Sequence, residues 1–357
     1  MRTGTIALGL VGLAGMLGGG AALVAGPLTP PAGPVAPTFK TLADVQPRTA
    51  VQSLSGDNGA RYVISQPGSY YLTGNITGVA NMDGIRVTAS GVSIDLCGFK
   101  LDGAGVGYYG VNLGPAAIEG VSVRNGTLAN WAWGGVYGVS ASGCELESLR
   151  VLSCDTALHP GPGSVIRSCE ARGGANAFVT EGNSRIENCA AGGYSQIGYL
   201  VGDGSAAIQC SSSGGTCGFI AYSNNASIID CVARGGTQGI DLPGGGGNRV
   251  ERCKIGQVPV GIRSVAANTI VGNTINANTL GAGSGIVLDQ RNSVVEGNHL
   301  HAFQNGIVVT GGDNIVTGNV MTSCSVPIAG GGASASVVGT VVTSSAGLTN
   351  STVNIAK

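Results

Sequence analysis

Apolar and polar positions alternate along most of this chain in a pattern that returns about every 20–22 residues. The segments LTGNI, IDLCG, IRSCE, IENCA, IIDCV, VERCK, IVGNT, VEGNH and VTGNV show it, with a Cys or Asn near the end of each. A period of this size is typical of solenoids, in which each repeat forms one coil. Aligning the repeats gives one column of mostly Cys and Asn, made of Asn75, Cys97, Asn125, Leu149, Cys169, Cys189, Cys210, Cys231, Cys253, Asn273, Asn298 and Asn319.

A second column contains a small residue followed by an apolar one. From each of these pairs to the next Cys or Asn position there are always 12–15 residues, whereas the other part of the repeat varies more in length. Insertions are therefore expected at one corner of the coil only. The first five pairs of this column are Gly84-Ile85, Gly110-Val111, Gly135-Val136, Ala157-Leu158 and Ala177-Phe178.

These two columns predict an all-β fold, a right-handed single-stranded parallel β-helix of about twelve coils over residues 71–330. A repeat of this length with short strands and Gly or Asn turns cannot hold a core alone, so each inward column must be buried on its neighbours. The chain has neither the Leu-x-x-Leu-x-Leu frame of leucine-rich repeats nor the Trp-Asp period of propellers.

The two ends of the chain differ from the repeats. Residues 1–25 begin with Met-Arg and continue as an apolar Gly/Ala/Leu/Val stretch, which predicts a signal peptide, with an uncleaved anchor as the alternative. Residues 26–70 are expected to form a Pro-rich segment and an N-terminal cap, with a short helix at Thr41–Val45. Residues 331–357 are expected to be a C-terminal cap or a low-complexity tail. A secreted, periplasmic or cell-surface location follows, with no membrane contact after cleavage.

The columns resemble those of right-handed parallel β-helix repeat proteins of the pectin-lyase-like superfamily, including NosD-like carbohydrate-binding and sugar-hydrolase modules. The resemblance covers residues 70–330. The segments PPAGPVAPTFKTLADVQPRT and QPGSYYLTGNITG also look like those of exported bacterial β-helix proteins of unassigned function. The resemblance implies the fold and hardly constrains the activity.

Composition narrows the function classes. Aromatic residues make up 4% of the chain, charged residues 10%, and the net charge is −1. Without a basic stripe the chain cannot neutralise a series of phosphates, so nucleic acid is not expected as a partner. The ten cysteines suggest disulfides in an exported protein. In a parallel stack, however, their side chains point the same way, which favours a buried ladder of free thiols at Cys97, Cys169, Cys189, Cys210, Cys231 and Cys253.

Acidic residues were considered as catalytic groups, because polysaccharide hydrolases use paired carboxylates. Glu147, Arg167 and Glu187 fall on consecutive coils, as do Arg150 and Glu170, which predicts a charge ladder on a solvated face. The Asp-Asp pair and Gly-His-Gly of polygalacturonases are absent from the sequence. Asp241 and Asp289 lie two coils apart at different offsets, unlike the clustered acidic Ca²⁺ ligands of pectate lyases. No catalytic residue is therefore assigned.

Two further groups remain as candidate sites. Glu296, His299 and His301 have metal-like spacing, with both His on one face of a strand, but exposed polar residues are the simpler interpretation. No metal or other cofactor is therefore assigned. Five aromatic residues fall within two successive coils, where they either bind a sugar by ring stacking or close a small core beneath the longer loops. This candidate ligand site comprises Tyr108, Tyr109, Trp131, Trp133 and Tyr137.

Three functions remain open from the sequence. The first is an exported, non-catalytic β-helix protein that binds a polysaccharide or cell-surface glycan or acts as a cell-surface scaffold. The second is a polysaccharide lyase or glycoside hydrolase with a divergent site. The third is a structural or adhesive rod.

Overall fold

The structure is a computed structural model that describes residues 48–114, 117–330, 336–339, 341–342 and 354–356. The predicted signal peptide, the Pro-rich segment up to residue 47 and the helix expected at Thr41–Val45 lie outside these residues. Residues 47–357 form one compact unit. Within the described part of the chain, no helix is both long and apolar enough to cross a membrane.

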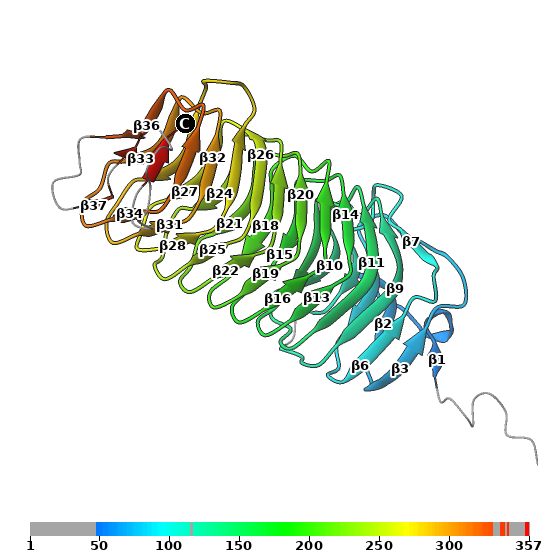
Figure 1. Cartoon of the computed structure of the whole chain (residues 1–357). Coiled ribbons are helices and arrows are strands. Elements are labelled where there is room, and N and C mark those ends of the chain that lie inside the picture. Colours follow the sequence, from blue (N-terminus) through cyan, green and yellow to red (C-terminus); the bar gives the residue numbers. More distant parts are fainter. Residues whose placement is uncertain (1–47, 115–116, 331–335, 340, 343–353, 357) are drawn as a thin grey trace, which may run out of the picture. The chain divides into compact units, whose positions relative to one another are not determined.

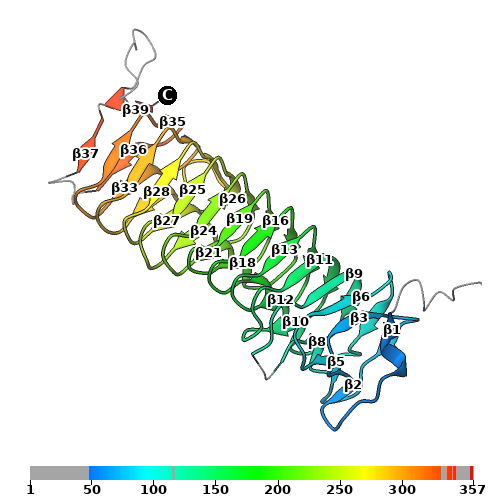
Figure 2. The same cartoon turned by 90° about the horizontal axis from the view of Figure 1, so that it is seen from below.

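The unit is a right-handed parallel β-helix, as the sequence predicts (Figure 1). Its smaller sheet, called sheet B, contributes one strand to each coil, and these strands follow one another along the solenoid from β2 to β36 (Figure 2). The strands of sheet B are β2 (Ala60–Ile64), β5 (Asp83–Val87), β8 (Tyr109–Asn112), β10 (Gly134–Gly138), β12 (Thr156–Pro160), β15 (Asn176–Val179), β18 (Ile197–Val201), β21 (Cys217–Ala221), β24 (Gln238–Leu242), β27 (Val260–Ser264), β30 (Ser284–Leu288), β33 (Asn305–Val309) and β36 (Val326–Ala329).

The remaining strands form the larger sheet A, which wraps around the rest of each coil. They are β1 (Thr49–Ala50), β3 (Gly68–Tyr71), β4 (Ile76–Thr77), β6 (Val92–Asp95), β7 (Lys100–Asp102), β9 (Ser122–Ala129), β11 (Glu145–Leu152), β13 (Val165–Arg167), β14 (Glu170–Arg172), β16 (Arg185–Glu187), β17 (Ala190–Gly192), β19 (Ala206–Ile208), β20 (Ser211–Ser213), β22 (Ser227–Ile229), β23 (Val232–Arg234), β25 (Arg249–Glu251), β26 (Lys254–Val258), β28 (Thr269–Val271), β29 (Thr274–Ala277), β31 (Val294–Glu296), β32 (His299–His301), β34 (Ile315–Thr317), β35 (Val320–Thr322), β37 (Val337–Val338), β38 (Val341–Val342) and β39 (Asn354–Ala356).

The solenoid has thirteen coils, one more than expected, because sheet B has thirteen strands. The additional coil is the first one. Strands β1 and β2 and most of β3 lie in residues 26–70, where a cap was predicted, and β1 pairs in parallel with β3. A 3₁₀ turn at Val51–Ser53 follows β1. At the other end, β37 pairs with β34 and β39 pairs with β35, so described parts of the predicted tail extend sheet A.

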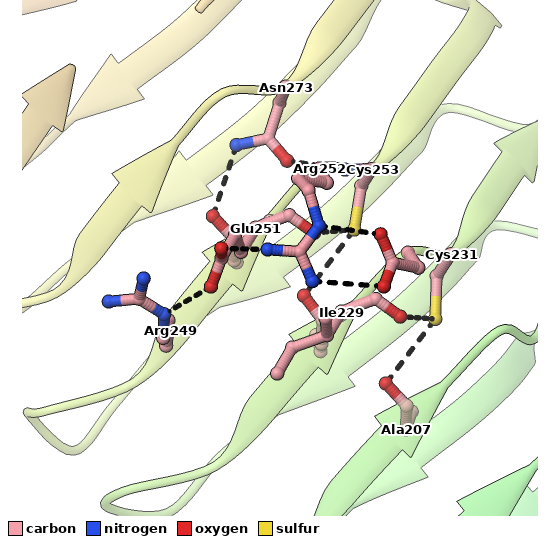
Figure 3. Close-up of polar contacts among 11 residues, drawn as sticks. Ala207, Ile229, Cys231, Arg249, Glu251, Arg252, Cys253 and Asn273 are labelled. Atoms are coloured by element: carbon pink, nitrogen blue, oxygen red, sulfur yellow. Dashed lines mark hydrogen bonds and ion pairs between the residues drawn. The ribbon is translucent and has the colours of Figure 1, made fainter. Parts of the chain in front are cut away.

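The Cys/Asn column is confirmed as a buried ladder from Leu149 to Asn319. Strand pairing aligns these residues coil by coil, and each is at most 2% exposed. The thiols donate to main-chain carbonyls, as Cys231 does to Ala207 at 3.4 Å and to Ile229 at 3.2 Å (Figure 3). In the structure, all ten cysteines are free thiols.

The asparagines of the ladder make stronger and more continuous bonds than the thiols. The Asn273 amide donates to the carbonyl of Val250 at 3.1 Å and to Oδ1 of Asn298 at 2.9 Å. Oδ1 of Asn273 in turn accepts from the main-chain N–H of Cys253 at 2.8 Å (Figure 3). Asn298 repeats the arrangement with Asn319. Each coil therefore satisfies polar groups of the coils beside it, which a buried main chain requires.

The predicted column is wrong at Asn75, Cys97 and Asn125, which are all exposed. Cys97 and Asn125 have φ values of 51° and 63°, the left-handed conformation that Ser168 adopts just before the ladder residue Cys169. They therefore occupy the corner that precedes the ladder position. The thiol ladder consequently has five members, and Cys97 is not one of them.

Candidate functional site

Two columns of side chains cover the outer face of sheet B, and they follow directly from the strand register. One column stands at the start of each strand, and the other directly follows the inward apolar residue. In the N-terminal coils the first column contains Asp83, Tyr109, Gly134, Thr156 and Asn176, and the second contains Arg86, Asn112, Tyr137, His159 and Val179. Chemically reactive and aromatic side chains are thus brought into line along the first coils.

The aromatic side chains of these coils pack against one another. Tyr108 stacks on Trp133 with ring centroids 3.9 Å apart, and Tyr109 stacks on Tyr137 at 4.6 Å. Tyr109 also meets the edge of Trp133 at 5.5 Å, and Tyr137 meets His159 at 5.6 Å. We call this group of five residues the aromatic face.

Glycine makes the close packing on the aromatic face possible at one position. Gly134 occupies the column between Tyr109 and Thr156, and a Cβ atom there would lie 2.9 Å from the Thr156 carbonyl oxygen and 3.2 Å from the Tyr109 ring. Because Gly134 has no side chain, the Tyr109 ring is free to lie over this position and reach Tyr137. Trp133 remains 50% exposed. The aromatic face therefore has one large ring surface open to solvent.

Trp131 was predicted to share this ligand site, and the structure contradicts that prediction. It is only 1% exposed, and its indole N–H donates to the carbonyl of Leu101 at 3.1 Å. Its ring fills the inside of the first coils, where Cβ atoms at Gly103 and Gly107 would lie within 2.7 Å of it. The small-core interpretation is thus correct for Trp131.

An ionic cluster lies beside the aromatic face. Arg86 donates to Asp83 at 3.0 Å from Nη2 and to Asp57 at 3.0 Å from Nη1. Asn112 donates to the same Asp83 oxygen at 2.9 Å. Arg86, Asn112 and Tyr137, together with Gly114, line a hollow of about 450 Å³. The hollow lies at the side of the rings and is large enough for part of a small polar ligand.

Burial and nearby negative charges shape the electrostatics of this face. Burial raises the pKa of the Tyr109 phenol, and the neighbouring Tyr137, Asp83 and Asp155 raise it further. The main-chain N–H of Gly59 lowers the pKa of Asp57, and Ala60 and Arg86 add to this effect. The Tyr109 phenol is thus neutral near pH 7 and can donate a hydrogen bond.

His159 belongs to the aromatic face, although no role was predicted for it from the sequence. Its Nε2 atom lies 2.8 Å from Oε1 of Glu181, on the next coil. The signal that could have found it was available, because His159 directly follows the apolar residue of its repeat, as Tyr137, Asn112 and Arg86 do in theirs.

The metal candidate is not assembled into a site. His299 and His301 lie on the same exposed side of β32, as predicted, and both are near the Thr322 hydroxyl, at 3.5 Å and 2.8 Å. Among the residues that the structure describes, no group of three or more His, Cys, Asp or Glu side chains could hold a metal ion. Glu296 therefore does not complete a site with the two imidazoles.

The predicted charge ladder is present. Glu147 pairs with Arg167 at 3.0 Å, and Arg150 pairs with Glu170 at 3.3 Å on the same sheet. Glu187 is aligned with Arg167 but forms its ion pair with Arg185. These side chains are well exposed to solvent, so the pairs are screened and add little to stability.

Asp241 and Asp289, two coils apart, are connected by one arginine. Arg263 lies 2.8 Å from Asp289 and 3.7 Å from Asp241. Burial raises the pKa of Asp241, which Arg263 partly offsets. Arg263, on the coil between them, thus contacts both carboxylates although these stand at different offsets in the repeat.

Comparisons with known proteins agree with the fold. Residues 199–353 match the family model described as "Right handed beta helix region". None of the curated proteins matches the chain. A solved structure of DFA-IIIase from Arthrobacter chlorophenolicus A6 in complex with GF2 is 12% identical, with a TM-score of 0.50 over 76% of this chain and 87% of that one.

Two further solved structures are similar. A PL6 alginate lyase in complex with a trisaccharide is 14% identical, with a TM-score of 0.49 over 82% of this chain and 85% of that one. The tailspike protein of E. coli bacteriophage HK620, as a double mutant, is 12% identical, with a TM-score of 0.48 over 86% of this chain and 73% of that one. At such identities a shared fold does not transfer an activity.

Proposed function

We propose that this protein is an exported, non-catalytic β-helix protein that binds a glycan on its aromatic face. The observation that carries the proposal is the half-exposed ring of Trp133, which is held in place by Tyr108. Sugars present apolar C–H faces that stack on such rings and hydroxyl groups that bond to polar neighbours. The half-exposed carboxylate of Asp57 and the phenol of Tyr109 offer such neighbours.

The aromatic face is suited to binding because it is preorganised. Stacking partners fix the rings of Trp133 and Tyr137 before any ligand arrives, which reduces the entropy lost on association. Two or three ring contacts, each contributing about 0.5–1.5 kcal/mol, would support weak binding to a repeating polymer. Export is proposed from the apolar segment at residues 1–25.

The proposal is tested by screening the protein on a polysaccharide array for retention. Wild-type protein is expected to be retained by a subset of glycans, and Trp133→Ala is expected to lose at least tenfold in affinity for them. Tyr222→Ala is the matched control, because Tyr222 is 54% exposed and lies outside the aromatic face. Unchanged retention by the Trp133 variant would refute the assignment of the site.

A second candidate function, a glycoside hydrolase with a divergent site, is favoured by the pair Asp241 and Asp289. Glycosidases use one protonated and one ionised carboxyl group, and the raised pKa of Asp241 suits the protonated role. Release of reducing sugar from an array glycan, abolished by Asp241→Asn but not by Trp133→Ala, would establish this alternative. If no glycan is retained or cleaved, the structural or adhesive rod remains.

A further inference from the structure

The charges around the aromatic face are mainly negative. Asp57 and Asp83 lie beside Arg86 at one end, and Glu181 lies beside His159 on the next coil. Asp155 is exposed at the edge of the same face, where the next residue, Thr156, donates its main-chain N–H to the Trp133 carbonyl at 3.0 Å. Asp155 also lines a hollow of about 260 Å³, together with Trp131 and Ala132.

The guanidinium of Arg86 is not available to an incoming anion. Nε and Nη2 donate to Asp83, and Nη1 donates to both oxygens of Asp57. The side chain is only 21% exposed, and the carboxylate of Asp83 is 4% exposed. To bind Arg86, a ligand carboxylate would have to displace the carboxylate of Asp83 or that of Asp57. Four carboxylates, those of Asp57, Asp83, Asp155 and Glu181, thus face one guanidinium and one imidazole, so acidic groups outnumber basic ones around the aromatic face.

We infer that the aromatic face selects uncharged glycans and disfavours polymers of uronic acids. The inference rests on the proposed function and adds the chemical class of its ligand. Neutral sugar hydroxyls donate hydrogen bonds to the carboxylates of Asp155 and Glu181, whereas a uronate carboxylate is repelled by them. Each further uronate that lies near these carboxylates adds to this repulsion.

The test compares binding of two oligosaccharides of equal length, xylohexaose and hexagalacturonate, to the full chain by calorimetry. At about 20 mM salt we expect xylohexaose to bind at least tenfold more tightly. The ratio should shrink towards unity near 1 M salt, where the screening length falls to about 3 Å. A separate neutral probe, chitohexaose, keeps the comparison independent of one sugar type.

Charge-neutral variants test the cause of the selection. The double substitution Asp155→Asn with Glu181→Gln should raise the affinity for hexagalacturonate at least threefold and leave the thermal melting temperature within a few degrees. Glu296→Gln, an exposed carboxylate on β31 of sheet A, is the matched control and should change neither affinity.

Three outcomes are distinguishable. Tighter binding of hexagalacturonate than of both neutral probes would overturn the inference while the proposed function stands. A neutral preference that the double substitution and high salt leave unchanged would also overturn it, because charge would then not be its cause. If each probe binds the Trp133→Ala variant as tightly as the wild-type protein, or if no probe binds, the proposed function fails together with the inference.

Discussion

The inside and the outside of the coil wall follow different rules in this protein. Inside, the ladder from Cys169 to Asn319 places the same kind of side chain at the same position on eight successive coils. Outside, the aromatic face is confined to a few N-terminal coils, and the column that holds Tyr137 and His159 continues as Val179, Leu200 and Ile220 and then as Asp241 and Arg263. The repeat is therefore strict where each coil must satisfy its neighbour and is broken where side chains meet solvent.

This difference indicates where function is to be sought in a solenoid. A ladder residue has a structural reason to recur, since the carbonyl it binds recurs in every coil. The rings of Trp133 and Tyr108 have no such reason, because neighbouring coils fold without them. The following predictions test whether the inner and outer positions really differ in this way.

The largest effect is expected from Trp131, which lies two residues from Trp133 but inside the wall. Trp131→Ala should lower the free energy of unfolding by about 3–5 kcal/mol, because it leaves a large cavity between the first coils. Urea denaturation followed by circular dichroism measures it. If the variant does not express, Trp131→Phe should still fold and lose about 1–2 kcal/mol, since the hydrogen bond to Leu101 is lost. A loss below 0.5 kcal/mol in both would contradict the inner position.

A smaller but still large effect is expected within the asparagine part of the ladder. Asn298→Leu should lower the free energy of unfolding by about 2–5 kcal/mol, because the main-chain N–H of Asn273 and the carbonyl of Ile270 lose their partner. The same denaturation experiment applies. Asn298→Cys is the matched control and should cost less, since a thiol still donates to that carbonyl. If Asn298→Cys lowers the free energy of unfolding as much as Asn298→Leu does, a thiol cannot replace the amide at this position.

The thiol part of the ladder should be more tolerant. Cys210→Ala should cost about 1–2 kcal/mol, because it removes contacts of 3.6 Å and 3.3 Å from the sulfur to the carbonyls of Ile186 and Ile208 and leaves a small cavity. Comparison with Asn298→Leu under identical conditions measures the difference. A cost above that of Asn298→Leu would reverse the order predicted here.

The smallest effect on stability is expected on the outside. Trp133→Ala should change the free energy of unfolding by less than about 0.5–1 kcal/mol, because half of the ring already meets solvent. It should nevertheless abolish glycan retention. A differential melting experiment on the variant, with Trp131→Ala beside it, separates the two tryptophans. Strong destabilisation by Trp133→Ala would indicate that the ring is needed for folding rather than for binding.

Most of the fold could be predicted from the sequence, because in a solenoid equivalent residues of successive coils recur at a nearly constant spacing along the chain. The ladder from Leu149 onward was predicted correctly, since each repeat there bends at the same corner. The alignment failed at Cys97 and Asn125, where the early coils change length: four residues separate Asp95 from Lys100, but two separate their partners on the next coil. A shift of one position there moves a side chain from the ladder to the exposed corner.

The candidate site was predictable only in part. Trp131 and Trp133 are two residues apart, which would put them on one side of a strand, but they lie in the turn before β10, where that alternation does not hold. His159 and Arg86 were missed because the residue that directly follows the inward apolar residue of each repeat was not aligned as a column of its own. The Asp57 carboxylate, in the turn before β2, could not be placed beside Arg86 by spacing alone.

In the five-membered thiol ladder, folding of the coils competes with disulfide formation while the protein is being made. Before the coils close, cysteines about twenty residues apart in the unfolded chain are free to meet, and they can form disulfides wherever the compartment is oxidising. After closure the five cysteines are at most 2% exposed, so a disulfide partner or exchange catalyst cannot contact their sulfur atoms. Burial also raises the pKa of other interior thiols, Cys154 and Cys217, to about 12. In an oxidising compartment the ladder would therefore stay reduced only where coil formation is faster than cross-linking.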